Sequence, residues 1–210
     1  MNLEKMLSAQ AELDKHIIEK KGLHGFDLVP NTFLALQVEL AEFANEGRWF
    51  KHWSDDQEPR TIKCIKESKL ETVDGIRKVV DEGAYINPLL EKFADAIHFY
   101  LSIANQKSWQ DSLYIYEEQL DPDDFDGDLT AWYLEMTYFI NKSHFEKPSE
   151  EKSKQWKEKF GFPEKQYWFR MAWILFLNIG INGFGFTPEQ IEEAYFAKNT
   201  VNHQRQESGY

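Results

Sequence analysis

The sequence predicts an all-α protein, a helical bundle with a small helical insertion, on the basis of three observations. Apolar side chains recur near the 3.6-residue helical period along most of the 210 residues. Two of these runs begin with a capping residue followed directly by proline, a common start of a helix. No segment shows sustained alternation of apolar and polar residues, so no strand is expected. The length suffices for one domain with a substantial core.

The chain carries a net charge of −12 and a single cysteine, Cys64. Such an acidic chain is not expected to bind nucleic acid or anionic membranes directly, although a local basic cluster or a metal can still hold a small phosphorylated ligand. One cysteine cannot form an internal disulfide, which fits a reducing cytosol, and we expect Cys64 to be buried and structural. The sequence shows neither a signal peptide nor an apolar run suited to spanning a bilayer, so a cytoplasmic protein is expected.

The first predicted helix covers about residues 2–20 and ends before Gly22 and Gly25. Gln10 and Asp14 lie one turn apart on it, on a side away from the main apolar stripe. Taken alone, these two side chains are expected to face solvent.

The second predicted helix starts near Pro30, with Asn31 as a plausible N-cap, and runs to about Glu46. Glu39 and Glu42 stand at i and i+3, with Glu46 one further turn along, so like charges share one helix face and repel. Hydration by water is the common way in which repulsion between such carboxylates is reduced. Binding of a hard divalent cation by the carboxylates is the more specific alternative.

Aromatic and basic side chains alternate between Arg48 and Trp53. Such a pattern can hold a base and its phosphates, although packing explains each aromatic side chain taken singly. Between about residues 61 and 81, the apolar spacing suggests one or two helices, weakened at Gly75.

The third predicted helix begins with an N-cap at Asn87, followed by proline, and runs to about residue 106. One strip of this helix carries polar residues at i, i+4 and i+7, namely Glu91, Asp95 and His98. This strip is a second acidic face, and we expect the two acidic helices to pack against each other.

The segment that follows differs in character and is interpreted as a helical insertion, residues 107–163, with helical periods near 109–120 and 129–145. Its acidic stretch 121–128 is similar to a calcium loop, but the spacing places Pro122 and Tyr133 at ligand positions, the second of which requires a carboxylate. We therefore expect a solvated loop.

An apolar run at about residues 164–182 predicts a buried core helix. Thr187, Pro188 and Gln190 have the spacing of a capping box that starts a last helix. One polar, partly cationic face of that helix carries Tyr195, Lys198, Asn199, Asn202 and Arg205.

Two acidic helix faces suit one or more Mg²⁺ ions, because Mg²⁺ prefers octahedral oxygen coordination and can bridge phosphate oxygens. Lys198 and Arg205 supply the positive charge that a polyphosphate requires. A metal, cations and aromatic side chains together indicate a nucleoside triphosphate as the ligand.

Three segments resemble the dimeric all-α dUTPases of phages, relatives of the broader all-α nucleotide pyrophosphohydrolases: ELAEFANEGRWFKHW, LLEKFADAIHFYLSIANQ and YFAKNTVNHQRQESGY. By this resemblance, residues 1–106 and 164–210 form the catalytic core, and residues 107–163 form the variable insertion. It also implies a homodimer in the cytoplasm, that of the host if the chain is phage-encoded. Such an enzyme hydrolyses dUTP, and with it dUDP, to dUMP with Mg²⁺, and two or more ions are expected.

The resemblance assigns roles to individual residues. Glu39 is the base that orients the attacking water, and the metal ligands are Glu39, Glu42 and Asp95. The phosphate-binding residues are Lys198, Arg205, Asn199, Asn202 and Tyr210. The nucleoside-binding residues are Gln10, Asp14, Trp53 and His98.

The sequence departs from the family at Lys92, which stands three residues before Asp95 where a glutamate is usual. Glu91 lies on the same helix face as Asp95, so we expect it to serve as the metal ligand after a modest rotation. If it does not, one metal site is weakened, and the charge of Lys92 weakens it further.

Three alternatives stay open. The first is a related pyrophosphohydrolase that acts on other nucleoside triphosphates. The second is a di-iron carboxylate bundle, which requires two carboxylate–histidine pairs, whereas the sequence supplies only Asp95 with His98. The third is a phage protein whose main role is to bind a repressor partner through aromatic side chains of the insertion.

Overall fold

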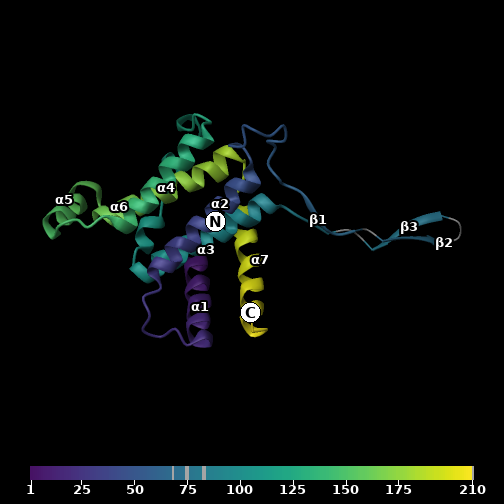
Figure 1. Cartoon of the computed structure of the whole chain (residues 1–210), viewed down its shortest axis with the longest axis horizontal. Coiled ribbons are helices and arrows are strands. Elements are labelled where there is room, and N and C mark those ends of the chain that lie inside the picture. Colours follow the sequence, from purple (N-terminus) through teal and green to yellow (C-terminus); the bar gives the residue numbers. More distant parts are fainter. Residues whose placement is uncertain (68, 74–75, 82–83, 210) are drawn as a thin grey trace.

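The computed structural model describes residues 1–67, 69–73, 76–81 and 84–209, and it confirms the all-α fold class (Figure 1). In chain order the helices are α1 (Leu3–Lys21), α2 (Val29–Gly47), α3 (Pro88–Lys107), α4 (Leu129–Phe145), α5 (Glu150–Phe160), α6 (Glu164–Asn178) and α7 (Pro188–Glu207). A π-helical turn, Ile179–Gly183, continues α6.

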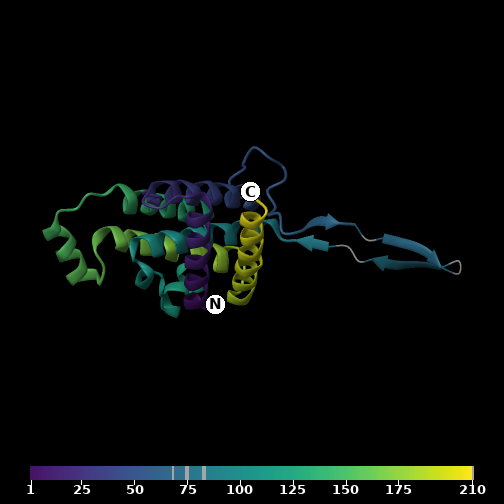
Figure 2. The same cartoon turned by 90° about the horizontal axis from the view of Figure 1, so that it is seen from below.

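Four of these helices, α1, α2, α3 and α7, form the part of the bundle that carries the predicted site. Helix α2 packs along α3, and α7 packs against both α1 and α3. Helices α1 and α7 lie side by side and run in the same direction (Figures 1 and 2). The two acidic helices are therefore neighbours, as the sequence predicts.

The start of α3 follows the predicted cap. The Asn87 Oδ1 atom accepts a hydrogen bond from the Leu90 backbone N–H at 3.0 Å. The predicted capping box of α7 is also confirmed, because Thr187 and Gln190 accept each other's backbone N–H groups at 3.0 and 3.2 Å. Local signals therefore fix the first turns of both helices.

The start of α2 differs from the prediction. The helix begins at Val29, its N-cap residue is Leu28, and Asn31 lies inside the first turn. The Asp27 carboxylate accepts the Val29 N–H at 3.1 Å instead. The expected Asn31 cap is therefore wrong, because Pro30 fits the first turn of a helix and does not force a later start.

Aromatic rings fill the core between α2, α3 and α6. The rings of Phe93 and Phe176 stack with centroids 4.1 Å apart, and Phe43 packs against both. A Cβ atom added at Gly180 would lie 2.4 Å from the Phe93 ring, so this close approach requires glycine. Since Phe93 precedes Asp95 by half a turn, this packing also fixes the rotation of α3 at the site.

Within the predicted insertion, helix α4 spans the expected residues and packs along α6. The stretch near 109–120 forms two short 3₁₀ helices, Gln110–Leu113 and Glu117–Leu120. The guanidinium of buried Arg170 donates to the Ser112 carbonyl at 2.9 Å and to Gln119 Oε1 at 2.7 Å, which ties this segment to α6. Helix α5 occupies the lysine-rich run, where no helix was expected.

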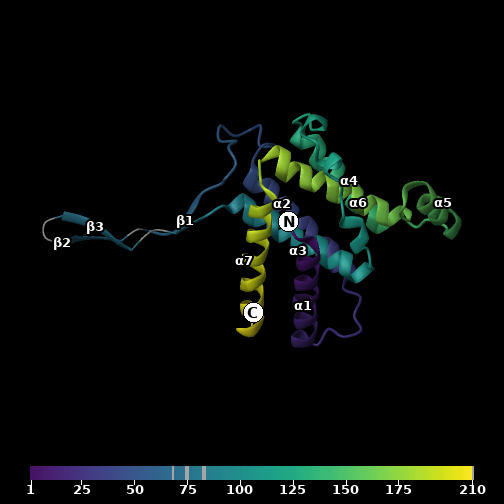
Figure 3. The same cartoon turned by 180° about the vertical axis from the view of Figure 1, so that it is seen from behind.

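A two-stranded antiparallel arm replaces the helices expected near residues 61–81, and that prediction is wrong. Strand β1 (Lys63–Lys66) pairs with β4 (Ala84–Ile86), and β2 (Lys69–Val73) pairs with β3 (Ile76–Asp81). The arm leaves the helical body at the end opposite α5 (Figures 1 and 3). Gly75, the expected weak point of the helix, lies outside the described residues.

The side chains of β1 are all exposed. A strand without a buried face needs no apolar–polar alternation, so β1 carries no alternation signal, while its one β-branched residue, Ile65, favours the extended chain. Cys64 lies in β1 and is exposed, so the expected buried role is also wrong.

Among the described residues, no helix taken singly has the length and apolar character needed to cross a membrane. The α6 segment and α7 meet that test only as a pair, bent by 113°.

Candidate functional site

Helices α1, α2, α3 and α7 enclose a pocket of about 460 Å³, which we call the acidic pocket. Ten of the residues expected from the sequence line it: Gln10, Asp14, Glu39, Glu42, Glu91, Asp95, His98, Lys198, Asn202 and Arg205. Each helix contributes one strip of side chains, so residues far apart in the chain meet here because the helices pack side by side.

Lys92 occupies the centre of the carboxylates from α2 and α3. Its Nζ atom lies 2.5 Å from Glu42 Oε2 and 3.3 Å from both Glu39 Oε2 and Asp95 Oδ2. Burial alone would lower the pKa of Lys92, but the hydrogen bond to Glu42 and the nearby carboxylate charges raise it above its ordinary value. The Lys92 side chain is therefore a fixed positive charge.

Lys198 of α7 approaches the same group of carboxylates from the other side. Its Nζ atom lies 2.9 Å from Glu91 Oε1 and 3.0 Å from Asp95 Oδ1. Burial alone would raise the pKa of Glu91, yet the hydrogen bond and charge of Lys198 bring it below its ordinary value. Asp95 thus lies between the ammonium groups of Lys92 and Lys198, and Glu91 also contacts that of Lys198.

Glu39 is the carboxylate with the environment expected of a proton acceptor. Its pKa is raised, mainly because the side chain is half-buried and also because the charges of Asp95 and Glu42 repel its own, while Lys92 opposes the shift. A carboxylate with a raised pKa holds a proton more readily than an exposed glutamate does.

A buried polar network lies beside the carboxylates. The Gln10 amide donates to Asp14 Oδ1 at 2.7 Å, and its Oε1 lies 2.7 Å from His98 Nδ1. Tyr195 donates its hydroxyl to the same Oε1 at 3.2 Å. Gln10 is only 4% exposed, so the expectation that it faces solvent is wrong: α3 and α7 cover this side of α1.

This hydrogen-bond pattern fixes the state of His98. Because Gln10 Oε1 can only accept, Nδ1 carries the proton and Nε2 presents a lone pair. Burial lowers the pKa of His98 to about 3, and the positive charge of Lys198 adds to the effect. Its Nε2 atom is buried and has no hydrogen-bond partner within the described part of the chain.

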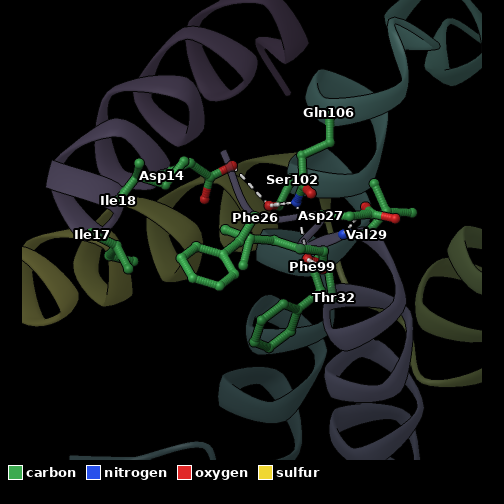
Figure 4. Close-up of a pocket in the computed structure, with 11 residues that line it drawn as sticks. Asp14, Ile17, Ile18, Phe26, Asp27, Val29, Thr32, Phe99, Ser102 and Gln106 are labelled. Atoms are coloured by element: carbon green, nitrogen blue, oxygen red, sulfur yellow. Dashed lines mark hydrogen bonds between the residues drawn. The ribbon is translucent and has the colours of Figure 1, made fainter. Parts of the chain in front are cut away.

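A second, more apolar pocket of about 410 Å³ adjoins the acidic pocket. The two share Asp14, Ile17, Phe99 and Ser102 as walls. Figure 4 shows the hydrogen bonds along its polar wall. Ser102 donates to Asp14 Oδ2 at 2.7 Å, and the Gln106 amide donates to Ser102 Oγ at 3.0 Å and to Thr32 Oγ1 at 2.9 Å.

Ser102 and Gln106 were missed in the sequence, although a signal was present. They continue the strip of Asp95 and His98 along α3 at the helical spacing, so extending that strip by two turns finds both. Phe26 and Thr32 come from the α1–α2 loop and the first turn of α2, and no periodic signal marks them.

Three expected residues lie elsewhere. Trp53 is 68% exposed, packs against Phe50 and His52, and is not among the described residues that line either pocket. Asn199 is buried behind the α7 face. Tyr210 lies outside the described residues.

Across the described ranges, no group of three acidic, histidine or cysteine side chains is spaced to hold a metal ion as it stands. The reason is the position of the two lysines, whose ammonium groups lie between the carboxylates. The chemistry of the donors nevertheless fits a divalent ion. The lining of the pocket carries five carboxylates and three cationic side chains, which leave two negative charges, the charge that one Mg²⁺ would neutralise.

A family model described as dUTPase matches residues 2–85 and 78–210, which together cover almost the whole chain. A comparison with curated proteins found no match.

Proposed function

The chain belongs to the dUTPase family and is a dUTP diphosphatase, and from this premise we propose that the acidic pocket is its active site. The observation that carries the proposal is the meeting of Glu39, Glu42 and Asp95 with the cations Lys92 and Lys198 in one pocket. Clustered carboxylates bind a divalent ion, and Lys198 supplies charge for the phosphates.

We propose that the divalent metal, which dUTPases generally use, is Mg²⁺ held by Glu39, Glu42, Asp95 and Glu91. The charge of the pocket without nucleotide matches one such ion, and the triphosphate of dUTP brings further negative charge for the two or more ions that the family resemblance implies. When bound, the ion neutralises charge on phosphate oxygens and acidifies the attacking water.

Glu39 is the proposed general base. It accepts a proton from the attacking water, whose oxygen forms a bond to phosphorus while the bond to the leaving pyrophosphate oxygen breaks. Its raised pKa suits this role, because a base is most effective when its pKa lies closer to the working pH. The same attack on dUDP would release phosphate, so dUDP is a proposed second substrate.

Lys198 and Arg205, with Asn202, are the proposed phosphate-binding residues of α7, and all three line the acidic pocket. The nucleoside is proposed to lie beyond them along α1 and α3, where Gln10, Asp14 and His98 form the buried network. The unpaired Nε2 of His98 supports this placement, since a ligand N–H could donate to it.

We also propose a homodimer through an apolar face of α2 and α4. Leu34 and Val38 of α2 are exposed, as are Leu134 and Tyr138 of α4. Gln37 donates to Asn141 Oδ1 at 3.1 Å, which brings this part of α2 next to α4. Exposed apolar side chains on two neighbouring helices support an interface in an otherwise highly charged chain.

The variant Glu39→Gln tests the proposed site. The amide keeps the shape of the side chain but cannot accept the proton, so we expect dUTP hydrolysis to fall by at least about a thousandfold. Circular dichroism and thermal unfolding should stay close to those of the wild-type protein. A folded variant that retains activity would exclude Glu39 as the base, and loss of folding would indicate a structural carboxylate.

The matched control is Glu46→Gln, one turn further along α2 and paired with Arg60 at 3.6 Å. It removes the same charge from the same helix, and it is not among the described residues that line the acidic pocket. We expect this control to hydrolyse dUTP at a rate close to that of the wild type.

A further inference from the structure

The surroundings of Lys92 resemble a metal site more closely than an ordinary surface ion pair. Three carboxylates from two helices converge on one Nζ atom at 2.5 to 3.3 Å. An ammonium group has three N–H donors, so it can bond to one oxygen of each carboxylate at once. A surface lysine usually pairs with one partner and contributes little.

Asp95 is the carboxylate that makes the arrangement specific. It is almost fully buried, and its two oxygens are divided between cations: Oδ2 faces Lys92 at 3.3 Å, and Oδ1 faces Lys198 at 3.0 Å. A buried carboxylate needs such compensation, because an unpaired buried charge is strongly unfavourable. Both sides of Asp95 are thus compensated by the chain itself, without an ion.

Glu42 gives the cluster an open side. Its carboxylate is about half exposed, whereas that of Asp95 is enclosed. One divalent ion can therefore reach the cluster from the pocket side through Glu42 and Glu39. A second ion between Glu39, Glu42 and Asp95 would have to take the volume that the Lys92 ammonium fills.

We propose that the Lys92 ammonium takes the place of one divalent cation between Glu39, Glu42 and Asp95. The chain then binds one divalent ion fewer than it would with a carboxylate at position 92. In this role Lys92 is a positioning residue, which keeps the base Glu39 next to Asp95 when no ion is bound. The proposal rests on the proposed function only for the choice of nucleotide used in the test.

The test counts Mn²⁺ ions bound per chain by calorimetry and by electron paramagnetic resonance. The wild-type protein is compared with Lys92→Glu, each with and without a non-hydrolysable dUTP analogue. We expect Lys92→Glu to bind about one more Mn²⁺ per chain, because it replaces a cation with a further carboxylate ligand. Equal counts in the two proteins would overturn the proposal.

The matched control is Lys154→Glu on α5. It makes the same change of charge on a side chain that is 79% exposed and far from the pocket lining. Its Mn²⁺ count should equal that of the wild type. An additional ion in this control would show that net charge alone attracts Mn²⁺, and it would also overturn the proposal.

Lys92→Met keeps the proposal testable if the five clustered carboxylates of Lys92→Glu prevent folding without metal. It removes the ammonium and adds no ligand, so we expect the first Mn²⁺ to bind about tenfold or more tightly than in the wild type. Unchanged affinity would refute the role of Lys92. Counting bound Mn²⁺ needs no turnover of substrate. Failure to hydrolyse dUTP would therefore refute the proposed function, whereas the role of Lys92 is decided by the ion counts alone.

Discussion

At the scale of single residues, His98 shows how burial prepares the pocket. Its ring stacks on Tyr195 with centroids 4.2 Å apart, and its Nδ1 lies 2.7 Å from Gln10 Oε1. A protonated ring would place a second buried cation close to Lys198, which explains why burial and that charge lower the pKa of His98 to about 3. His98 therefore offers a neutral ring to the pocket.

This lowered pKa predicts a loss of stability in mild acid. The unfolded chain protonates His98 near its ordinary pKa of 6.5, whereas the folded chain does so near 3. Stability from this residue is complete above pH 6.5 and is lost as the pH falls toward 3, by up to about 1.4 kcal/mol per pH unit. Urea unfolding of the metal-free protein at about pH 7.5 and about pH 5 should show a difference of roughly 2 kcal/mol from His98.

The control is His98→Gln, which keeps hydrogen-bonding capacity and does not titrate. The free energy of unfolding of this variant should fall less between the two pH values than that of the wild type. If the free energy of unfolding falls by the same amount in both proteins, protonation of His98 does not cause the loss, and the lowered pKa of His98 is contradicted.

At the scale of the elements, sequence alone finds what is encoded locally. Helix α3 was predicted with its cap and its acidic strip, because Asn87 and the spacing of Glu91 and Asp95 are local signals. The strands of the arm were missed, and in β1 the reason is that all four side chains are exposed, so this strand has no buried face to impose alternation. The inward position of Gln10 was missed, because it depends on α3 and α7 covering α1.

The cap of α3 is a test of how much the first turn contributes. Asn87→Ala removes the side-chain acceptor for the Leu90 N–H, so we expect the free energy of unfolding to fall by about 1 kcal/mol. Since Glu91 lies in this first turn, the KM for dUTP should also rise.

Asp128→Ala is the matched control for the cap. It removes an equivalent bond to the Ala131 N–H at the start of α4, outside the acidic pocket. We expect a similar loss of stability, measured by urea unfolding, with an unchanged KM. If KM also rises in the control, a general loss of stability, and not the change at the start of α3, weakens the binding of dUTP.

At the scale of the whole molecule, the acidic pocket and the exposed apolar side chains of α2 adjoin each other. Glu39 and Glu42 line the pocket, while Leu34 and Val38 remain exposed. Val38 stands one turn before Glu42 on the same strip of the helix, so an interface at Leu34 and Val38 would lie beside the pocket. The arm is a third feature and projects from the body (Figure 1), with exposed Ile62 directly before β1 and exposed Ile65 within it.

Leu34→Glu tests whether the α2–α4 face joins two copies of the chain. Leu34 is 62% exposed, and burial of such a side chain contributes about 1.5–3 kcal/mol. A two-fold interface contains it twice, so the dimer dissociation constant should rise by at least about a hundredfold. Sedimentation velocity over a range of protein concentrations measures this shift.

Ile62→Glu provides the comparison, because Ile62 is 76% exposed and lies directly before β1 of the arm, not on α2 or α4. It introduces the same charge in place of an equally apolar side chain. If Leu34→Glu dissociates the dimer and Ile62→Glu does not, the interface lies on α2 and α4. The reverse result would place it on the arm, and the exposed stripe of α2 would then need another explanation.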